Sequence, residues 1–194
     1  MTPFVNAHTH RFGGDGIEMR GMGVHPWHAD HEDPAALDWR GEYDYVGETG
    51  LDYACHVPRE AQMGVFQRQL AIAQELQKPV VLHCVRAFSD CMAELAKHDL
   101  KGVVFHGFMG SVEQMRQLCK KGYYASFGDN TRRSPRKAEA SLREIPCENL
   151  LLETDDSPIT IAEIYAYAAE VRGVTMETLK TQIYKNYGSL AGTN

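Results

Sequence analysis

Short apolar runs alternate with longer amphipathic stretches along almost the whole chain, and this alternation limits the possible folds more than any other feature. The clearest run, residues 79–84, is apolar without polar alternation, as expected of a strand that is covered on both faces. Residues 58–77 instead carry apolar side chains such as Phe66 and Leu70 at helical spacing. Strands that alternate with helices in this way indicate repeated βα units and therefore a parallel sheet.

The pattern predicts an α/β fold with seven strands and six helices. The strands are expected at residues 2–7, 20–24, 43–47, 79–84, 102–105, 123–127 and 150–153. The helices are expected at residues 58–77, 87–98, 111–121, 134–144, 159–172 and 176–191. The chain of 194 residues contains no linker rich in Pro, Gly or Ser, so we expect a single domain over residues 1–194.

Composition excludes several classes of protein. The net charge of -6 gives no general attraction for phosphate polymers, which disfavours a nucleic-acid packaging protein and leaves only a local basic patch open. The five cysteines include no C-x-x-C pair and indicate neither a disulfide framework nor a thiolate zinc site. Because residues 1–8 lack a basic leader and no stretch approaches the roughly 18 apolar residues of a membrane span, we expect a cytoplasmic protein without a membrane partner.

Metal-ligating residue types stand where the expected strands end. His8 and His10 form an H-x-H pair whose side chains point to the same face of a strand and can therefore chelate one metal. Such a short motif is weak on its own, but four further candidates end later apolar runs: Glu48, His83, His106 and Asp155. The carboxyl ends of parallel strands meet at one edge, where α/β folds assemble their active sites.

This ligand set has a definite chemistry. It offers nitrogen and oxygen donors without a thiolate, which suits Zn, Mn, Mg or Ni. A catalytic ion must keep an open coordination position, so the set is too large for one ion. We therefore expect two divalent metal ions, whose identity the donors leave open.

Five segments, taken in order, resemble the TatD family of metal-dependent hydrolases. They are Asn6-Ala7-His8-Thr9-His10, Gly23-Val24-His25-Pro26, Gly47-Glu48-Thr49-Gly50-Leu51-Asp52-Tyr53, Pro79-Val80-Val81-Leu82-His83-Cys84 and Leu152-Glu153-Thr154-Asp155. The resemblance spans nearly the whole chain and extends to the segment from His106 to Ser111. It implies a TIM-barrel-like parallel (β/α) barrel of the amidohydrolase group, with degradation of DNA from the 3′ end as the best-known activity.

The resemblance also implies roles for the ligands. His8, His10 and Asp155 would bind one metal, His83 and His106 the second, and Glu48 would bridge the two. Asp155 and Glu48 are therefore the expected catalytic residues. In such a centre two ions roughly 3.5 to 4 Å apart activate a shared water. Asp155 would orient or deprotonate that water.

The chain departs from the family pattern after the first strand. Only residues 11–19 separate His10 from the next expected strand, so a βα unit is missing there. The expected barrel is consequently shortened or distorted, with about seven strands in place of eight. Its open strand edges would need cover by a loop or a neighbouring subunit, and the oligomeric state stays open.

Four residues are candidates for substrate binding, and each has a structural alternative. His25 ends a strand and would either meet substrate or shape the loop at Pro26. Arg86 would hold a phosphate or be an ordinary surface charge at a helix start. Arg132 and Arg133 belong to the densest basic cluster, which would either contact phosphates or be a solvated helix start.

These expectations lead to one main hypothesis and two rivals. The main hypothesis is a two-metal phosphodiesterase, a 3′ to 5′ deoxyribonuclease that acts on single-stranded DNA or another phosphodiester. The first rival is a hydrolase of a small ester, amide or lactone that uses the same metal site, because loops vary around one metal core. The second rival is a metal-binding protein without catalytic activity.

Overall fold

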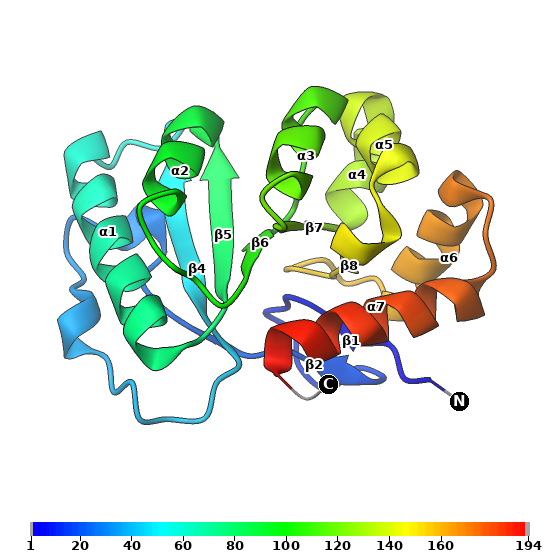
Figure 1. Ribbon diagram of the computed structural model, residues 1–194, viewed down its shortest axis with the longest axis horizontal. Helices are drawn as coiled ribbons and strands as arrows, with labels where there is room; N and C mark the ends of the chain where they lie inside the picture. The colour runs from blue at the N-terminus through cyan, green and yellow to red at the C-terminus, as the bar shows by residue number, and fades with distance from the viewer. Residues whose placement is uncertain (1, 193–194) are drawn as a thin grey trace. The chain divides into compact units, whose positions relative to one another are not determined.

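The computed structural model describes residues 2–192, and the chain forms two compact units. The first unit contains the described residues of Met1–Met19 and His106–Asn194, and the second is Arg20–Phe105. Figure 1 colours the chain from blue at its N-terminus to red at its C-terminus (Figure 1). Each unit combines parallel strands with helices, and the expectation of one domain over residues 1–194 stays a prediction.

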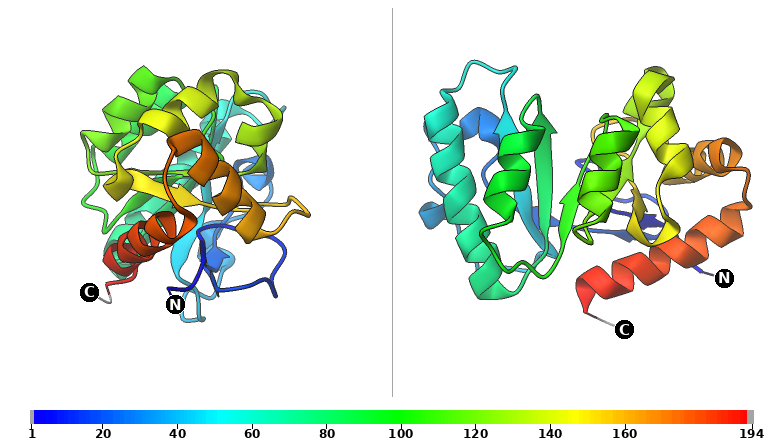
Figure 2. Two further views of the ribbon diagram at one scale, coloured as in Figure 1. Left: turned by 90° about the vertical axis from the view of Figure 1, so that its right-hand side faces the viewer. Right: turned by 45° about the horizontal axis from the view of Figure 1, so that its top comes forward.

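The second unit is built on parallel strands. These are β3 (Gly21–Met22), β4 (Tyr45–Asp52), β5 (Val80–Val85) and β6 (Val103–Phe105), hydrogen-bonded in that order. Helix α1 (Arg59–Leu76) lies along β4 and α2 (Phe88–Leu95) along β5 (Figure 1, Figure 2). Two 3-10 turns, η1 (Pro26–His28) and η2 (Pro34–Ala36), follow β3. Fully buried side chains from the strands and α1 form the core, among them Val46, Leu51, Phe66, Leu70, Val80 and Leu82.

The first unit contains two pairs of parallel strands. Strand β1 (Val5–Asn6) pairs with β2 (Ile17–Glu18), and β7 (Tyr124–Phe127) pairs with β8 (Leu150–Leu152). The backbone nitrogen of Ala7 donates to the carbonyl oxygen of Leu152 at 2.9 Å, which places the end of β1 beside the end of β8. The helical segments are α3 (Val112–Cys119), α4 (Asp129–Arg133), α5 (Pro135–Glu144), η3 (Cys147–Asn149), α6 (Ile161–Arg172) and α7 (Met176–Ala191).

All seven expected strands and all six expected helices are present within the described residues. Strand β2, helix α4 and the three 3-10 turns η1, η2 and η3 were not predicted from the sequence. Only Met19 and Arg20 separate β2 from β3, so the two strands share one extended segment, and this segment begins earlier than predicted. Residues 7–16 connect β1 to β2 without a helix, which agrees with the expected loss of a βα unit.

Helix α1 fixes the backbone of the neighbouring strand ends through two buried glutamines. The Oε1 atom of Gln62 accepts a hydrogen bond from the backbone nitrogen of Asp52 at 2.7 Å, and its Nε2 atom donates to the Asp52 carbonyl at 2.9 Å. Gln69 likewise accepts a hydrogen bond from the backbone nitrogen of Val24 at 2.7 Å and donates to the Val24 carbonyl at 2.9 Å. It also donates to the Thr49 hydroxyl at 2.7 Å. Buried polar groups must be paired, so these side chains hold the end of β4 in one geometry.

Two irregularities shape the end of β4. Its register with β5 shifts between Val46 and Thr49, and Glu48 lies within this bulge. Bulges bend a strand and redirect side chains, and they recur beside active sites. Gly50 has a φ of +131°, and a Cβ atom at this position would run into the carbonyl oxygen of His83. A glycine is therefore required where β4 approaches the His83 backbone.

None of the helices in residues 2–192 combines the length and apolar character that crossing a bilayer requires.

Candidate metal centre

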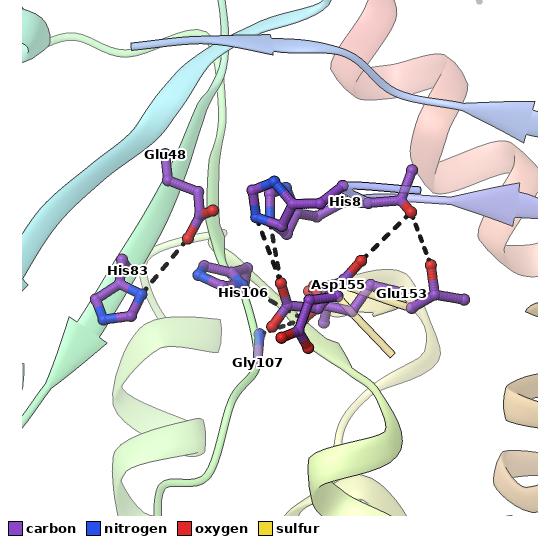
Figure 3. A network of polar contacts seen from close by, with 12 residues as sticks. His8, Glu48, His83, His106, Gly107, Glu153 and Asp155 are labelled. Carbon is purple, nitrogen blue, oxygen red and sulfur yellow. Dashed lines mark hydrogen bonds and ion pairs between the residues drawn. The ribbon is translucent and has the colours of Figure 1, made fainter. Parts of the chain in front are cut away.

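Three of the predicted ligands lie together in the first unit. The backbone nitrogen of His10 donates to the Asp155 carbonyl at 3.0 Å, and the backbone nitrogen of Asp155 donates to the His8 carbonyl at 3.1 Å. The Nε2 atoms of His8 and His10 both lie 3.6 Å from Oδ1 of Asp155. Figure 3 shows the His8 and Asp155 side chains turned toward one another (Figure 3). The H-x-H pair and the distant aspartate therefore lie together, and their role as ligands of one metal stays a prediction.

A buried polar network holds the backbone below this group. Asn6 accepts from the backbone nitrogen of Thr154 at 3.0 Å and donates to its hydroxyl at 2.8 Å. The Thr154 hydroxyl donates in turn to that of Thr9 at 3.0 Å. Asp155 follows with a φ of +53°, in the left-handed region, which aspartate tolerates better than most residues. Such outliers persist where the surroundings fix them, often at functional sites.

His106 lies beside His8, with ring centroids 4.6 Å apart, and a buried carboxylate stands behind it. Oε1 of Glu153 lies 3.4 Å from Nδ1 of His106 and accepts a hydrogen bond from the backbone nitrogen of Gly107 at 2.7 Å. Glu153 also binds the Ser126 hydroxyl, and its side chain is fully buried. A carboxylate only accepts, so the proton of neutral His106 is on Nδ1 and its Nε2 atom can bind a metal.

In the second unit, Glu48 and His83 face one another. Oε2 of Glu48 lies 3.5 Å from Nδ1 of His83, as the dashed line in Figure 3 marks (Figure 3). The bulge in β4 positions Glu48, and the parallel register of β4 and β5 brings the His83 segment alongside. Both side chains are largely buried, so an ion held here would be surrounded by little water.

Asp52 has the same position behind His83 that Glu153 has behind His106. Its Oδ2 atom lies 3.1 Å from Nε2 of His83 and accepts a hydrogen bond from Nε1 of Trp27 at 2.7 Å. Burial alone would raise the pKa of Asp52, but hydrogen bonds from Trp27, the Ala54 backbone and His83 outweigh it and lower the pKa. The ionised Asp52 therefore keeps the proton of His83 on Nε2, which directs the Nδ1 lone pair toward Glu48.

His25 joins this group, but its Nδ1 atom is engaged by the protein backbone. Its Nε2 atom lies 3.6 Å from Oε2 of Glu48, and its ring centroid lies 4.4 Å from that of His83. Its Nδ1 atom accepts a hydrogen bond from the backbone nitrogen of Trp27 at 3.1 Å. A backbone N–H can only donate, so neutral His25 carries its proton on Nε2. This geometry suits a hydrogen bond to an anion better than a bond to a metal.

The donor chemistry of both units fits divalent metal ions. Within the first unit, one ligand atom each of His106, Glu153 and Asp155 lie within 4.8 Å of one another, and within the second so do those of His25, Glu48 and His83. Apart from His25, whose Nδ1 lone pair accepts the Trp27 N–H, these groups offer nitrogen or oxygen donors that Zn, Mn, Mg and Ni accept. The grouping of His83 with His106 and the bridging role of Glu48 relate the two units to each other and stay predictions.

The three arginines that are predicted to contact phosphates lie in different surroundings. Arg86 is exposed just after β5, with a φ of +54°. Arg132 and Arg133 both bind Asp129, a buried carboxylate that the sequence analysis did not consider. Asp129 also accepts a hydrogen bond from the Ser157 hydroxyl at 2.9 Å. The two arginines remain half exposed, and Asp129 balances part of their charge.

A cavity of about 360 Å³ lies in the first unit, and its lining includes Asn6 and Thr154. One wall is the loop that connects β1 to β2, with Arg11, Phe12 and Asp15, and the opposite wall is the segment from Ser157 to Ala162. Nε of Arg11 donates to the carbonyl of Asp156 at 2.8 Å and so ties the two walls together. A volume in this range accommodates a small-molecule group.

Comparisons with known proteins agree with this geometry. Residues 18–192 match the family described as TatD related DNase, and the chain belongs to this TatD family of metal-dependent hydrolases. The "3'-5' ssDNA/RNA exonuclease TatD" of Citrobacter koseri is 33% identical over 201 residues, which cover 88% of this chain and 76% of that protein. The "Uncharacterized metal-dependent hydrolase YabD" of Bacillus subtilis is 30% identical over 158 residues, which cover 73% of this chain and only 62% of its own length.

A solved structure shows the same fold. The crystal structure of the TatD homologue YjjV from Escherichia coli K12 superposes with a TM-score of 0.79 at 26% identity, covering 90% of this chain and 76% of YjjV. The expected α/β fold of TIM-barrel type is thereby confirmed. Closure of the shortened barrel stays a prediction.

Proposed function

We propose that this protein is a two-metal phosphodiesterase that removes nucleotides from the 3′ end of single-stranded DNA. The observation that carries the proposal is the pair of histidines, His83 and His106, each backed by a buried carboxylate that fixes its protonation. Carboxylate–histidine–metal arrangements of this kind recur in metal sites, where they orient the ligand and raise its basicity. The name of the Citrobacter koseri relative, an exonuclease for single-stranded DNA and RNA, supports the same substrate class.

The proposed ligands form two sets. His8, His10 and Asp155 would hold one divalent ion, His83 and His106 the other, and Glu48 would bridge them. When bound, the ions lower the pKa of a water molecule and balance the charge that develops on phosphoryl oxygens. Asp155 would orient that water and take its proton. Its Oδ1 atom lies 3.6 Å from Nε2 of both His8 and His10, which would hold the first ion.

Substrate contacts in this proposal come from groups outside the ligand set. The N–H at Nε2 of His25 would donate to a phosphate oxygen, consistent with the acceptor role of its Nδ1 atom. Arg86 is exposed after β5 and would contact a further phosphate. Arg132 and Arg133 would contact phosphates along the DNA backbone, and Asp129 would limit how far their side chains move.

Two observations favour the second candidate, hydrolysis of a small ester, amide or lactone. The chain has a net charge of -6, and its densest basic cluster is partly neutralised by the buried Asp129. Both features weaken the attraction for a polyanion. The cavity of about 360 Å³ in the first unit would then hold the acyl or alcohol group of such a substrate.

The test uses metal-stripped protein and single-stranded DNA labelled at its 5′ end, with and without added magnesium or manganese. We expect metal-dependent shortening from the 3′ end that disappears in Asp155→Asn. Asp156→Asn is the matched control, since it makes the same change at the exposed neighbouring position and should retain activity. If wild-type protein binds metal and hydrolyses small esters but leaves DNA intact, the second candidate replaces the first.

A further inference from the structure

Trp27 presents a large aromatic surface beside the Glu48 and His83 pair. It lies in the middle of η1, and 53% of its surface is exposed. A single exposed aromatic side chain is ordinary on a protein surface. Trp27 differs because its Nε1 atom donates to Oδ2 of Asp52 at 2.7 Å, which fixes the orientation of the indole.

The neighbours of the indole belong to the proposed catalytic site. Its ring centroid lies 4.7 Å from that of His25, edge to face, and 5.9 Å from that of His83. The same carboxylate oxygen, Oδ2 of Asp52, contacts both Trp27 and His83. The aromatic ring is therefore fixed directly beside a metal-ligand histidine and beside the N–H that would contact a phosphate.

We propose that Trp27 is a stacking platform for a base of single-stranded nucleic acid, at the nucleotide adjoining the phosphodiester that is cleaved. The inference rests on the proposed function. Bases stack on aromatic side chains in proteins that bind single strands, and any base can stack because each has a π-face. The only polar atom of the indole is already engaged by Asp52, so the exposed surface offers stacking in place of hydrogen-bond selection.

The fixed orientation strengthens this assignment. An aromatic ring that is already immobilised loses little conformational freedom when a ligand binds, so more of the stacking energy is retained as affinity. The platform would recognise that a base is present without reading its identity. Cleavage would consequently depend on the base beside the scissile bond and tolerate changes of sequence.

The chain provides a matched control in its second tryptophan. Trp39 donates from Nε1 to the carbonyl of Pro34 at 2.8 Å and packs against Tyr43, with ring centroids 5.9 Å apart. These are the only two tryptophans of the chain, so Trp39→Phe leaves Trp27 as the sole indole fluorophore. The same substitution in kinetic assays controls for loss of a tryptophan elsewhere.

The kinetic test compares metal-loaded wild-type protein with Trp27→Ala, Trp27→Phe and Trp39→Phe. Each is given a single-stranded oligonucleotide and the same oligonucleotide with abasic sites at its 3′ end. We expect Trp27→Ala to raise KM about tenfold more for the normal oligonucleotide than for the abasic one. Loss of the hydrogen bond from Trp27 to Asp52 acts on both substrates alike, and Trp27→Phe loses that bond as well. Trp27→Phe should retain most of the affinity because it keeps an aromatic face, and Trp39→Phe should match wild type. Equal effects of Trp27→Ala on both substrates, or no effect on either, would overturn the proposal.

A binding measurement separates this proposal from the proposed function. Metal-loaded Trp39→Phe is titrated with a cleavage-resistant phosphorothioate oligonucleotide, and the fluorescence of Trp27 is followed. Stacking predicts quenching by the normal oligonucleotide and none by the abasic one. Quenching without cleavage of any oligonucleotide would reject the nuclease and keep the platform, whereas cleavage without quenching would reject the platform and keep the nuclease.

Discussion

Oε1 of Glu153 lies 3.4 Å from Nδ1 of His106 and accepts the backbone N–H of the next residue, Gly107, at 2.7 Å. One buried carboxylate therefore fixes both the ring and the backbone of a proposed metal ligand. Glu153→Gln would replace an acceptor with an amide that can donate, so His106 would lose its fixed protonation. We expect metal affinity to fall about 10- to 100-fold. Calorimetric titration of stripped protein with manganese measures it, and unchanged affinity in a folded variant would contradict this role.

The glycine at the end of β4 predicts a loss of stability. Gly50→Ala should lower the free energy of unfolding by about 2 to 4 kcal/mol, because φ is +131° and a Cβ atom would meet the His83 carbonyl. Gly64→Ala is the control, since it lies inside α1 with open space and should stabilise the protein by about 0.5 to 1 kcal/mol. Urea denaturation measures both, and similar effects would refute the steric argument.

Asp129 predicts a pH dependence of stability. Burial raises the pKa of Asp129, but hydrogen bonds from Arg132, Ser157 and Arg133 outweigh it and lower the pKa below 3.8. A lowered folded-state pKa stabilises the fold above pH 3.8, and this contribution is lost as pH falls through the folded-state value. Asp129→Asn should therefore lose about 1 to 3 kcal/mol at pH 7 and much less near pH 2. Parallel stability curves for variant and wild type between these pH values would show that the carboxylate contributes nothing.

The basic cluster predicts a salt effect. Replacing Arg132 and Arg133 with Ala should weaken binding to single-stranded DNA and make its dependence on salt concentration shallower, by roughly 0.7 in logarithmic slope per lost phosphate contact. Arg143→Ala is the comparison, because Arg143 forms an exposed ion pair with Glu139 on α5. Fluorescence anisotropy at several salt concentrations gives the slopes. An unchanged slope in the double variant would show that the DNA does not contact Arg132 and Arg133.

The elements of this protein, and the position of the candidate ligands at strand ends, were predictable because their signals are local. An apolar run such as residues 79–84 indicates its own strand, and a histidine directly after it lies where parallel strands end. Strand β2 was missed because Ile17 follows the glycine-rich residues 13–16 and stands outside any apolar run.

The carboxylates behind the histidines could not be assigned in the same way. Asp52 is 31 residues from His83 in the sequence, and Glu153 is 47 residues from His106. These pairings depend on the register in which neighbouring strands align. The register cannot be read from the sequence alone. Trp27 was missed for the same reason, since its partner Asp52 is 25 residues away in the sequence.

The connection from β1 to β2 contains both cavity-lining residues and the proposed ligands His8 and His10, but these occupy different parts of it. It forms one wall of the cavity through Arg11, Phe12 and Asp15, whereas His8 and His10 are anchored by backbone hydrogen bonds to Asp155. Surface loops tolerate insertion and deletion more readily than the strands that they connect. Substitutions or changes of length within residues 11–16 would consequently change the shape of the cavity, while the backbone hydrogen bonds that join His8 and His10 to Asp155 stay in place.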